Sequence, residues 1–112
     1  MKIITRKISG RGVGSQIGFP TFNFLAPAKL PQGVFAGRLN GLPAVIFCGK
    51  RKSFDKVFAL EVHLLDFQAT AFTQAEITFG AKIREIQQFT KITELQKQIR
   101  KDCAKAKALL AV

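Results

Sequence analysis

A carboxylate, a hydroxyl and an amide stand out because of where they occur in the sequence. Glu61 lies inside the apolar run VFALEVHLLDF, residues 57–67, where an unpaired carboxylate costs several kcal/mol to desolvate. Thr21 and Asn23 lie in FPTFNF, residues 19–24, and project to one side if this segment is extended. Hydroxyl and amide oxygens, completed by triphosphate oxygens and water, suit Mg²⁺. Two alternatives stay open: Thr21 and Asn23 can satisfy turn backbone groups, and Glu61 can be salt-bridged across a sheet.

Glycines are concentrated just before this segment, in GRGVGSQIG, residues 10–18. Glycine lets backbone N–H groups approach a phosphate closely, and Arg11 can add a bidentate contact. The spacing is not a Walker A loop, since no Gly-Lys-Ser/Thr follows, and G-x-G-x-x-G fails because position 17 is Ile. A loop with turn glycines would look the same, so this stretch alone is weak evidence for a phosphate site.

His63 follows Glu61 by two residues and would share its face in a strand. A lone histidine among apolar neighbours is usually a hydrogen-bonded core residue, and a direct role beside Glu61 is the alternative. Cys48 and Cys103 occur in a chain without a secretion signal, and we expect both to be reduced core residues.

The elements that must position these residues are short strands followed by one helix. Residues 10–32 show no sustained period and are predicted as a functional loop. A tight turn is predicted at Asn40-Gly41, because Asn-Gly supplies positive φ. In the longest strand, Glu61 and His63 would face one side, and Leu60 and Val62 the other. The predicted strands are 2–8, 33–39, 43–49, 57–67 and 75–79.

The helix is the clearest element in the sequence. Thr90 is its predicted N-cap, and Glu94 falls in its first turn. Basic residues fall elsewhere around the helix, as expected for a solvated face. The apolar positions step by three and four residues: Ile92, Leu95, Ile99, Cys103, Ala106 and Leu110.

Length and composition predict one domain over residues 1–112, because a second core would need roughly 50 more residues. Short strands with one C-terminal helix indicate a mostly β (α+β) domain that closes into a small barrel. No apolar run reaches the ~20 residues of a membrane span, and no signal peptide is evident, so we expect a cytoplasmic protein. We also expect a monomer. The formal net charge of +11 predicts an anionic partner: nucleic acid, an acidic membrane surface or a nucleoside triphosphate.

Five segments of the sequence, taken in order, resemble the riboflavin kinase (flavokinase) family. The resemblance extends from about Gly10 to Ala108, and its most specific part is Pro-Thr-x-Asn with a downstream Glu-x-His-x-x-x-x-Phe strand. The segments that carry it, in order, are GRGVGSQIGFPTFNF, LPQGVF, LEVHLLDF, IREIQQF and TKITELQKQIRKD.

The resemblance implies a closed six-stranded antiparallel Greek-key β-barrel with a C-terminal helix. It implies transfer of the ATP γ-phosphoryl group to the 5′-hydroxyl of riboflavin, giving FMN, with Mg²⁺ as cofactor. Glu61 would be the base, and Thr21 and Asn23 the metal ligands. The phosphate-binding residues would be Arg11, Gly12, Gly14, Gly18, Thr21 and Asn23, and the flavin-binding residues Arg84, Phe89 and Leu95.

The sequence departs from the family pattern in two loops. Residues 47–54 lack the Asn, Pro and Thr of the family's Asn-x-Gly-x-x-Pro-Thr-Phe, and Ala71-Phe72-Thr73 stands where Leu-Tyr-Gly is usual. In addition, Phe35 replaces the usual Tyr after Gly-Val. Bacterial members commonly carry an adenylyltransferase module in addition to this domain, so we expect either that FAD synthesis needs another chain or that this chain is an excised domain.

Two competing interpretations follow from the same observations. A small basic barrel can bind nucleic acid through Lys and Arg with Phe stacking, but here the Phe residues are mostly embedded in apolar runs. The altered loops at 50–54 and 71–73 instead allow a catalytically degenerate, flavin-binding module.

Overall fold

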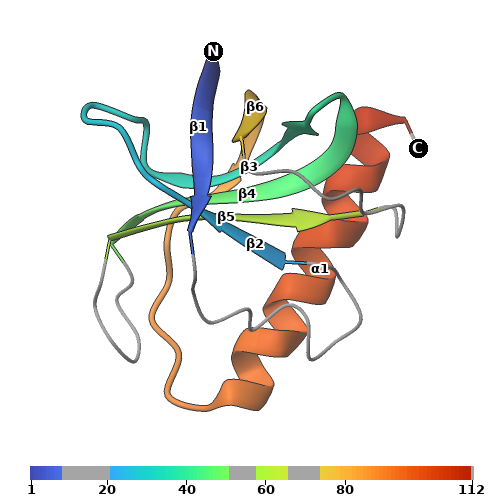
Figure 1. The fold of residues 1–112 in the computed structure, drawn as a ribbon. Helices are drawn as coiled ribbons and strands as arrows, with labels where there is room; N and C mark the ends of the chain where they lie inside the picture. The colour runs from blue at the N-terminus through green and yellow to red at the C-terminus, as the bar shows by residue number, and fades with distance from the viewer. Residues whose placement is uncertain (9–20, 51–57, 66–73, 112) are drawn as a thin grey trace.

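A computed structural model describes residues 1–8, 21–50, 58–65 and 74–111. In these ranges, six antiparallel strands form a closed barrel with the order β1-β2-β5-β4-β3-β6, and one helix lies along its side (Figure 1). Strands β3, β4 and β5 are consecutive neighbours, and β6 returns to lie beside β3, which is a Greek key. The predicted mostly β barrel with a C-terminal helix is confirmed. The elements are β1 Lys2–Ile8, β2 Thr21–Phe24, β3 Gly33–Leu39, β4 Leu42–Lys50, β5 Phe58–Leu64, β6 Gln74–Arg84 and α1 Ile92–Leu110.

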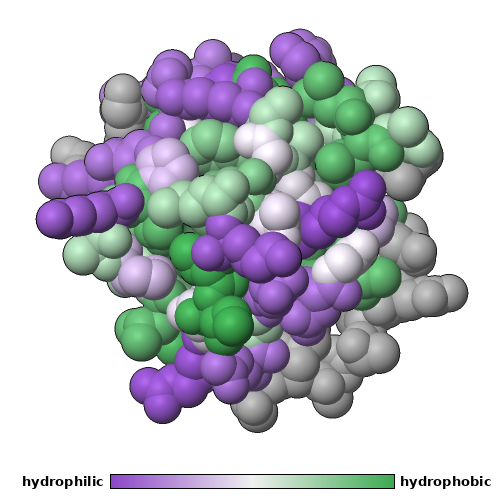
Figure 2. All heavy atoms as spheres, turned by 90° about the horizontal axis from the view of Figure 1, so that it is seen from above, coloured by the Kyte–Doolittle hydropathy of each residue, from purple (hydrophilic) through white to green (hydrophobic). Residues whose placement is uncertain are grey.

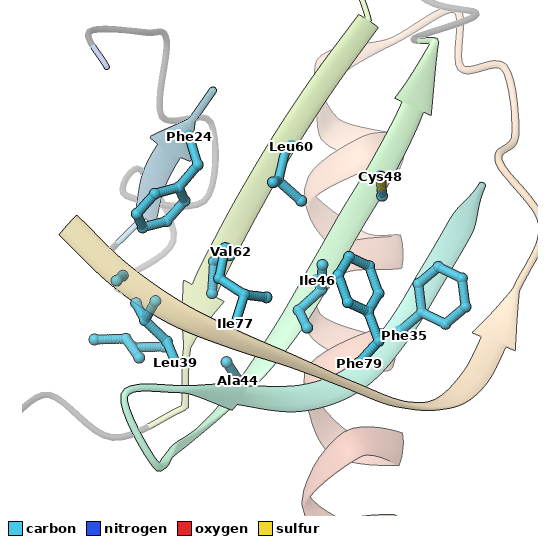
Figure 3. Packing of buried hydrophobic residues seen from close by; sticks show 12 residues of the cluster. Phe24, Phe35, Leu39, Ala44, Ile46, Cys48, Leu60, Val62, Ile77 and Phe79 are labelled. Atoms are coloured by element: carbon cyan, nitrogen blue, oxygen red, sulfur yellow. The ribbon is translucent and has the colours of Figure 1, made fainter. Parts of the chain in front are cut away.

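The barrel interior is filled by alternate apolar side chains of the strands, which point toward one another in Figure 3. Phe35 and Phe79 meet edge to face, with ring centroids 5.4 Å apart. Burying a side chain of this size stabilises the fold by about 1.5–3 kcal/mol relative to leaving it exposed. Inward-facing residues from β2, β4, β5 and β6 include Phe24, Ile46, Leu60, Val62, Leu64 and Ile77.

A second apolar cluster joins helix α1 to the outer surface of β3 and β4. It contains Val34, Ala36 and Val45 from the strands. Its buried helical members are Ile99, Cys103 and Ala106, with Leu95 and Leu110 packed against the cluster, which confirms the predicted apolar stripe at these positions. Ile92 was wrongly included in the stripe, since it is 42% exposed. Strands β3 and β4 are therefore covered on both faces, which explains why their sequences are almost continuously apolar.

The ends of two predicted elements are corrected. The N-cap of α1 is Lys91 and makes no side-chain cap hydrogen bond, so the prediction of Thr90 was wrong, whereas Glu94 does lie in the first turn. The last strand is longer than predicted, because β6 continues past Phe79 to Arg84. It pairs with β3 through register shifts around Phe35, which interrupt the alternation that a sequence pattern needs.

Strand β2 was not expected as a strand, because Thr21–Phe24 lies in a segment predicted as a loop. Four residues are too few to establish a period, and β2 is fixed by pairing with β1 on one side and β5 on the other. The predicted Asn40-Gly41 turn is confirmed, with φ of 50° and 83°.

Candidate functional site

The candidate site lies on the outer face of the barrel, where β2 pairs with β5. Asn23 lies directly opposite Glu61, and Thr21 lies directly opposite His63. Directly opposed residues have Cβ atoms about 4.5–5.5 Å apart, so these side chains are immediate neighbours. The predicted alternation of faces is confirmed in both segments. Phe24, which follows Asn23, points into the core together with Leu60, Val62 and Leu64. Two sequence segments about 40 residues apart thus meet at one place.

A chain of polar contacts links three of these side chains. The Thr21 hydroxyl Oγ1 lies 2.9 Å from His63 Nδ1, and His63 Nε2 lies 3.2 Å from Glu61 Oε1. Glu61 is 6% exposed and His63 is 3% exposed. A buried carboxylate needs a polar partner, and one partner of Glu61 is the imidazole on its own strand and face. The sequence placed His63 on this face but gave no sign that it would bridge Thr21 and Glu61.

Apolar residues of β4 border the other side of this polar group. Phe47 lies opposite Glu61, and Val45 lies opposite His63, on the same outer face. Val45 is buried in the apolar cluster that joins β3 and β4 to α1, and Phe47 is partly buried and packs against this cluster. The carboxylate of Glu61 therefore lies between an amide on one neighbouring strand and an aromatic ring on the other. A polar and an apolar part of the barrel surface therefore adjoin at Glu61.

The predicted flavin-binding residues lie around the end of β6 and the start of α1. The Arg84 guanidinium forms a bidentate ion pair with Asp102 of α1, with Nε 2.9 Å from Oδ1 and Nη2 2.8 Å from Oδ2. The Phe89 ring lies with its centroid 6.0 Å from Arg84 Cζ. Leu95 packs against the apolar cluster beneath α1. Arg84 is thus bound to the helix and to the Phe89 ring at once.

Asp102 was missed by the sequence analysis. It is 2% exposed, and besides Arg84 it accepts a hydrogen bond of 3.0 Å from Gln98 Nε2. A signal was present, because Asp102 falls three residues after Ile99 and four before Ala106, on the buried stripe of the helix.

The remaining predicted positions lie outside the described residues. They are Arg11, Gly12, Gly14 and Gly18, together with the altered loop positions 51–54 and 71–73. Among the residues that are described, no three His, Cys, Asp or Glu side chains are grouped to hold a metal ion by themselves. The neutral oxygens of Thr21 and Asn23 fit a cation that takes its other ligands from phosphate and water. In the described part of the chain, no helix is long and apolar enough to cross a membrane.

Comparisons with known proteins identify a family for the chain. A family model described as riboflavin kinase (flavokinase) matches residues 1–110. The bifunctional riboflavin kinase/FMN adenylyltransferase of Haemophilus influenzae is 35% identical over 116 residues, covering 96% of this chain and 38% of that protein. The Escherichia coli protein of the same description is 34% identical over 109 residues, covering 87% of this chain and 34% of that protein. The chain thus spans little more than a third of the length of these relatives.

A solved structure shows the same fold. The crystal structure described as a macrolide-efflux protein from Streptococcus pneumoniae superposes with a TM-score of 0.72 at 23% identity, covering 90% of this chain and 36% of that one. At this identity the likeness concerns the fold alone.

Proposed function

The chain belongs to the riboflavin kinase family, and from this premise we propose that it transfers the γ-phosphoryl group of ATP to the 5′-hydroxyl of riboflavin, giving FMN. The observation that carries the proposal is the register of β2 on β5, which brings Asn23 beside Glu61 and Thr21 beside His63. The family match covers residues 1–110, so it includes every residue to which we assign a role.

Glu61 is the proposed base. It orients the 5′-hydroxyl and accepts its proton as the new O–P bond forms and the bond to the β-phosphate oxygen of ADP breaks. Phosphoryl transfer depends mainly on positioning and charge neutralisation, so the base needs correct placement more than unusual basicity. The contact with His63, at 3.2 Å, supports a fixed orientation of the Glu61 carboxylate.

Thr21 and Asn23 are the proposed ligands of a divalent metal. The family uses ATP and, typically, a divalent metal, and we propose Mg²⁺ because a hydroxyl and an amide oxygen leave room for phosphate oxygens and water. When bound, Mg²⁺ neutralises charge on the triphosphate. Arg11 and the backbone at Gly12, Gly14 and Gly18 complete the proposed phosphate site, by resemblance to the family.

The flavin is proposed to bind on the apolar side of Glu61. Phe47 borders Glu61 there, and the family resemblance assigns flavin contacts to Arg84, Phe89 and Leu95. The bidentate pair between Arg84 and Asp102 supports a modified role for Arg84, in which it holds the Phe89 ring rather than the flavin itself.

The two alternatives are less well supported. A nucleic-acid interface would use several aromatic rings exposed among basic residues, whereas Phe24, Phe35 and Phe79 are buried in the core and, of the described Phe rings, Phe58 alone is exposed. A degenerate flavin-binding module rests on the altered loops alone. The expected single domain, monomeric state and cytoplasmic location stay predictions.

A substitution of Glu61 tests the proposal. The change Glu61→Gln keeps the size and polarity of the side chain but removes the base, so we expect kcat for FMN formation from riboflavin and Mg-ATP to fall by about 10²–10⁴-fold. The matched control is Glu76→Gln, a half-exposed carboxylate of β6, on the other side of the closed barrel, which pairs with Lys2. Its kcat should stay within about twofold of the unsubstituted protein.

Three results would separate the interpretations. Absence of turnover in the unsubstituted protein, with flavin still bound, would favour the degenerate module. Salt-sensitive binding of DNA or RNA without affinity for flavin would favour the nucleic-acid interpretation. Full turnover in the Glu61→Gln variant would remove Glu61 from the mechanism while leaving the kinase activity in place.

A further inference from the structure

His63 is the only histidine in the chain, and both of its ring nitrogens face groups that the proposed function uses. Nδ1 lies 2.9 Å from the Thr21 hydroxyl, and Nε2 lies 3.2 Å from the Glu61 carboxylate. The ring is 3% exposed. Burying an imidazole is unfavourable unless its nitrogens are paired, and here the two partners are a proposed metal ligand and the proposed base.

For a neutral imidazole, the chemistry of the two partners sets the direction of both contacts. A carboxylate can only accept, so the tautomer that pairs with Glu61 at 3.2 Å is the one that carries its proton on Nε2. In a neutral imidazole the other nitrogen is then an acceptor, and the Thr21 hydroxyl must donate to Nδ1. The proton of Thr21 is thereby directed toward His63, and the lone pairs of Oγ1 point elsewhere.

This direction matters for a metal ligand. A hydroxyl can bind a cation only through its oxygen lone pairs, and its proton has to point away from the cation. An acceptor behind the hydroxyl achieves this, in the same way that partners behind a metal ligand orient it in other metal sites. The same ring also fixes one oxygen of Glu61 and so orients the carboxylate.

We propose that His63, as the neutral Nε2–H tautomer, is a positioning residue that turns the Thr21 hydroxyl oxygen toward the cation-bound triphosphate and holds the Glu61 carboxylate toward the substrate hydroxyl. This inference rests on the proposed function for the roles of Thr21 and Glu61. It assigns to His63 a role in orienting two other groups and no contact with the substrate.

The tautomer is measured directly in the unliganded protein. Long-range proton–nitrogen correlation NMR of the imidazole ring needs no assignment between residues, because the chain has one histidine. We expect the proton on Nε2 and an acceptor at Nδ1. In the Thr21→Val variant, Nδ1 loses its donor and its resonance should move toward that of an unbonded ring nitrogen. The control Thr78→Val, on β6, should leave the spectrum unchanged. An Nδ1–H tautomer, a doubly protonated ring, or an Nδ1 resonance unaffected by Thr21→Val would overturn the inference.

Kinetics of two His63 variants separate positioning from packing. His63→Leu fills the space but orients neither neighbour, so we expect kcat to fall by about 10–100-fold, the usual effect of removing a partner behind a ligand, with smaller changes in KM. His63→Gln keeps one donor and one acceptor and should recover part of kcat. Thermal unfolding of both variants reports packing separately.

If His63→Leu folds and keeps the unsubstituted kcat while Glu61→Gln does not, this inference fails and the proposed function stands. If the unsubstituted protein shows no turnover, the proposed function fails, and the NMR measurement still decides the tautomer. If His63→Leu does not fold, the NMR comparison decides.

Discussion

The buried polar side chains belong to two clusters of different composition. The Asp102 carboxylate accepts hydrogen bonds from Nε and Nη2 of Arg84 and from the side-chain amide of Gln98. These bonds involve both of its oxygens. Such a group is structural. Glu61 and His63 instead lie on a face shared with Thr21 and Asn23, whose hydroxyl and amide oxygens are of the kind that suits a phosphate-bound cation. The composition of each cluster, rather than burial alone, distinguishes the structural carboxylate from the candidate base.

The metal assignment predicts a specific effect of Asn23→Leu. This change removes an amide oxygen at nearly constant size, and we expect the Mg²⁺ concentration for half-maximal FMN formation to rise by at least about tenfold, since loss of even an indirect metal partner typically costs 10–100-fold in affinity. The measurement is a Mg²⁺ titration at saturating ATP and riboflavin. Thr78→Val should titrate like the unsubstituted protein. An unchanged Mg²⁺ requirement in Asn23→Leu would show that Asn23 is not a metal ligand.

The two thiols give a prediction about pH. Burial raises the pKa of Cys48 to about 11, and burial together with the nearby Asp102 carboxylate raises the pKa of Cys103 to about 12, from 9.0. Above pH 9.0 the unfolded chain therefore binds fewer protons than the folded one, so the free energy of unfolding falls as pH rises. Urea denaturation from about pH 8 to about pH 10 should show this fall. A Cys48→Ala, Cys103→Ala variant should show a shallower one; an identical pH slope would contradict the assignment.

At the level of elements, the site depends on the register between a four-residue strand and its neighbour. A slip of one residue would move Thr21 and Asn23 to the inner face of the barrel and bring Phe22 and Phe24 outward. The core opposes such a slip, because Phe24 is 1% exposed and packs with residues of β5. The hydrophobic side of β2 thus specifies the position of its polar side. The closed barrel fixes β2 further, since β1 pairs with its other edge.

The ion pair between β6 and α1 predicts a large loss of stability when one partner is removed. Arg84→Leu leaves the nearly buried Asp102 carboxylate without its cation, and we expect a cost of about 3–5 kcal/mol in the free energy of unfolding. The exposed pair between Lys2 and Glu76 is the control, and Lys2→Ala should cost less than about 1 kcal/mol. Both values come from urea denaturation. The double change Arg84→Leu, Asp102→Leu should cost less than Arg84→Leu alone, and equal costs for Arg84→Leu and Lys2→Ala would contradict the prediction.

At the level of the whole molecule, the charge is much greater than one substrate needs. The chain has 18 Lys and Arg against 7 Asp and Glu. The outer side of α1 contributes five exposed basic residues: Lys97, Arg100, Lys101, Lys105 and Lys107. Hydrophilic side chains also lie among apolar ones over the face shown in Figure 2. This excess of positive charge attracts a triphosphate. The positive charges also repel one another, which lowers the stability of the compact state.

Self-repulsion predicts that salt stabilises the fold. Raising NaCl from about 10 mM to about 150 mM shortens the Debye length from about 30 Å to about 8 Å, which screens the repulsion between exposed charges. A gain of about 1 kcal/mol would raise the thermal midpoint by roughly 4–8 °C. Thermal unfolding followed by circular dichroism measures this midpoint, and KCl should act like NaCl. A midpoint that stays constant or falls with salt would show that the charges are already compensated in the fold.

Much of the architecture could be predicted from the sequence, because the patterns that encode it are local. The period of two in residues 58–64 correctly placed Glu61 and His63 on one face, and steps of three and four correctly placed Ile99, Cys103 and Ala106 under the helix. The Asn40-Gly41 turn follows from the backbone preference of two residues. These features depend on neighbours within a few positions, so one sequence is enough to predict them.

The tertiary structure alone decided which distant residues meet. Strand β2 exists because β1 and β5 pair with it, and no pattern within four residues specifies that pairing. The hydrogen bond between Thr21 and His63 joins residues 42 positions apart, and the pair of Arg84 and Asp102 joins residues 18 positions apart. A sequence displays periodicity along the chain, whereas register and closure are set by packing energies between segments. The sequence therefore determined the faces, and the closed barrel determined which faces adjoin.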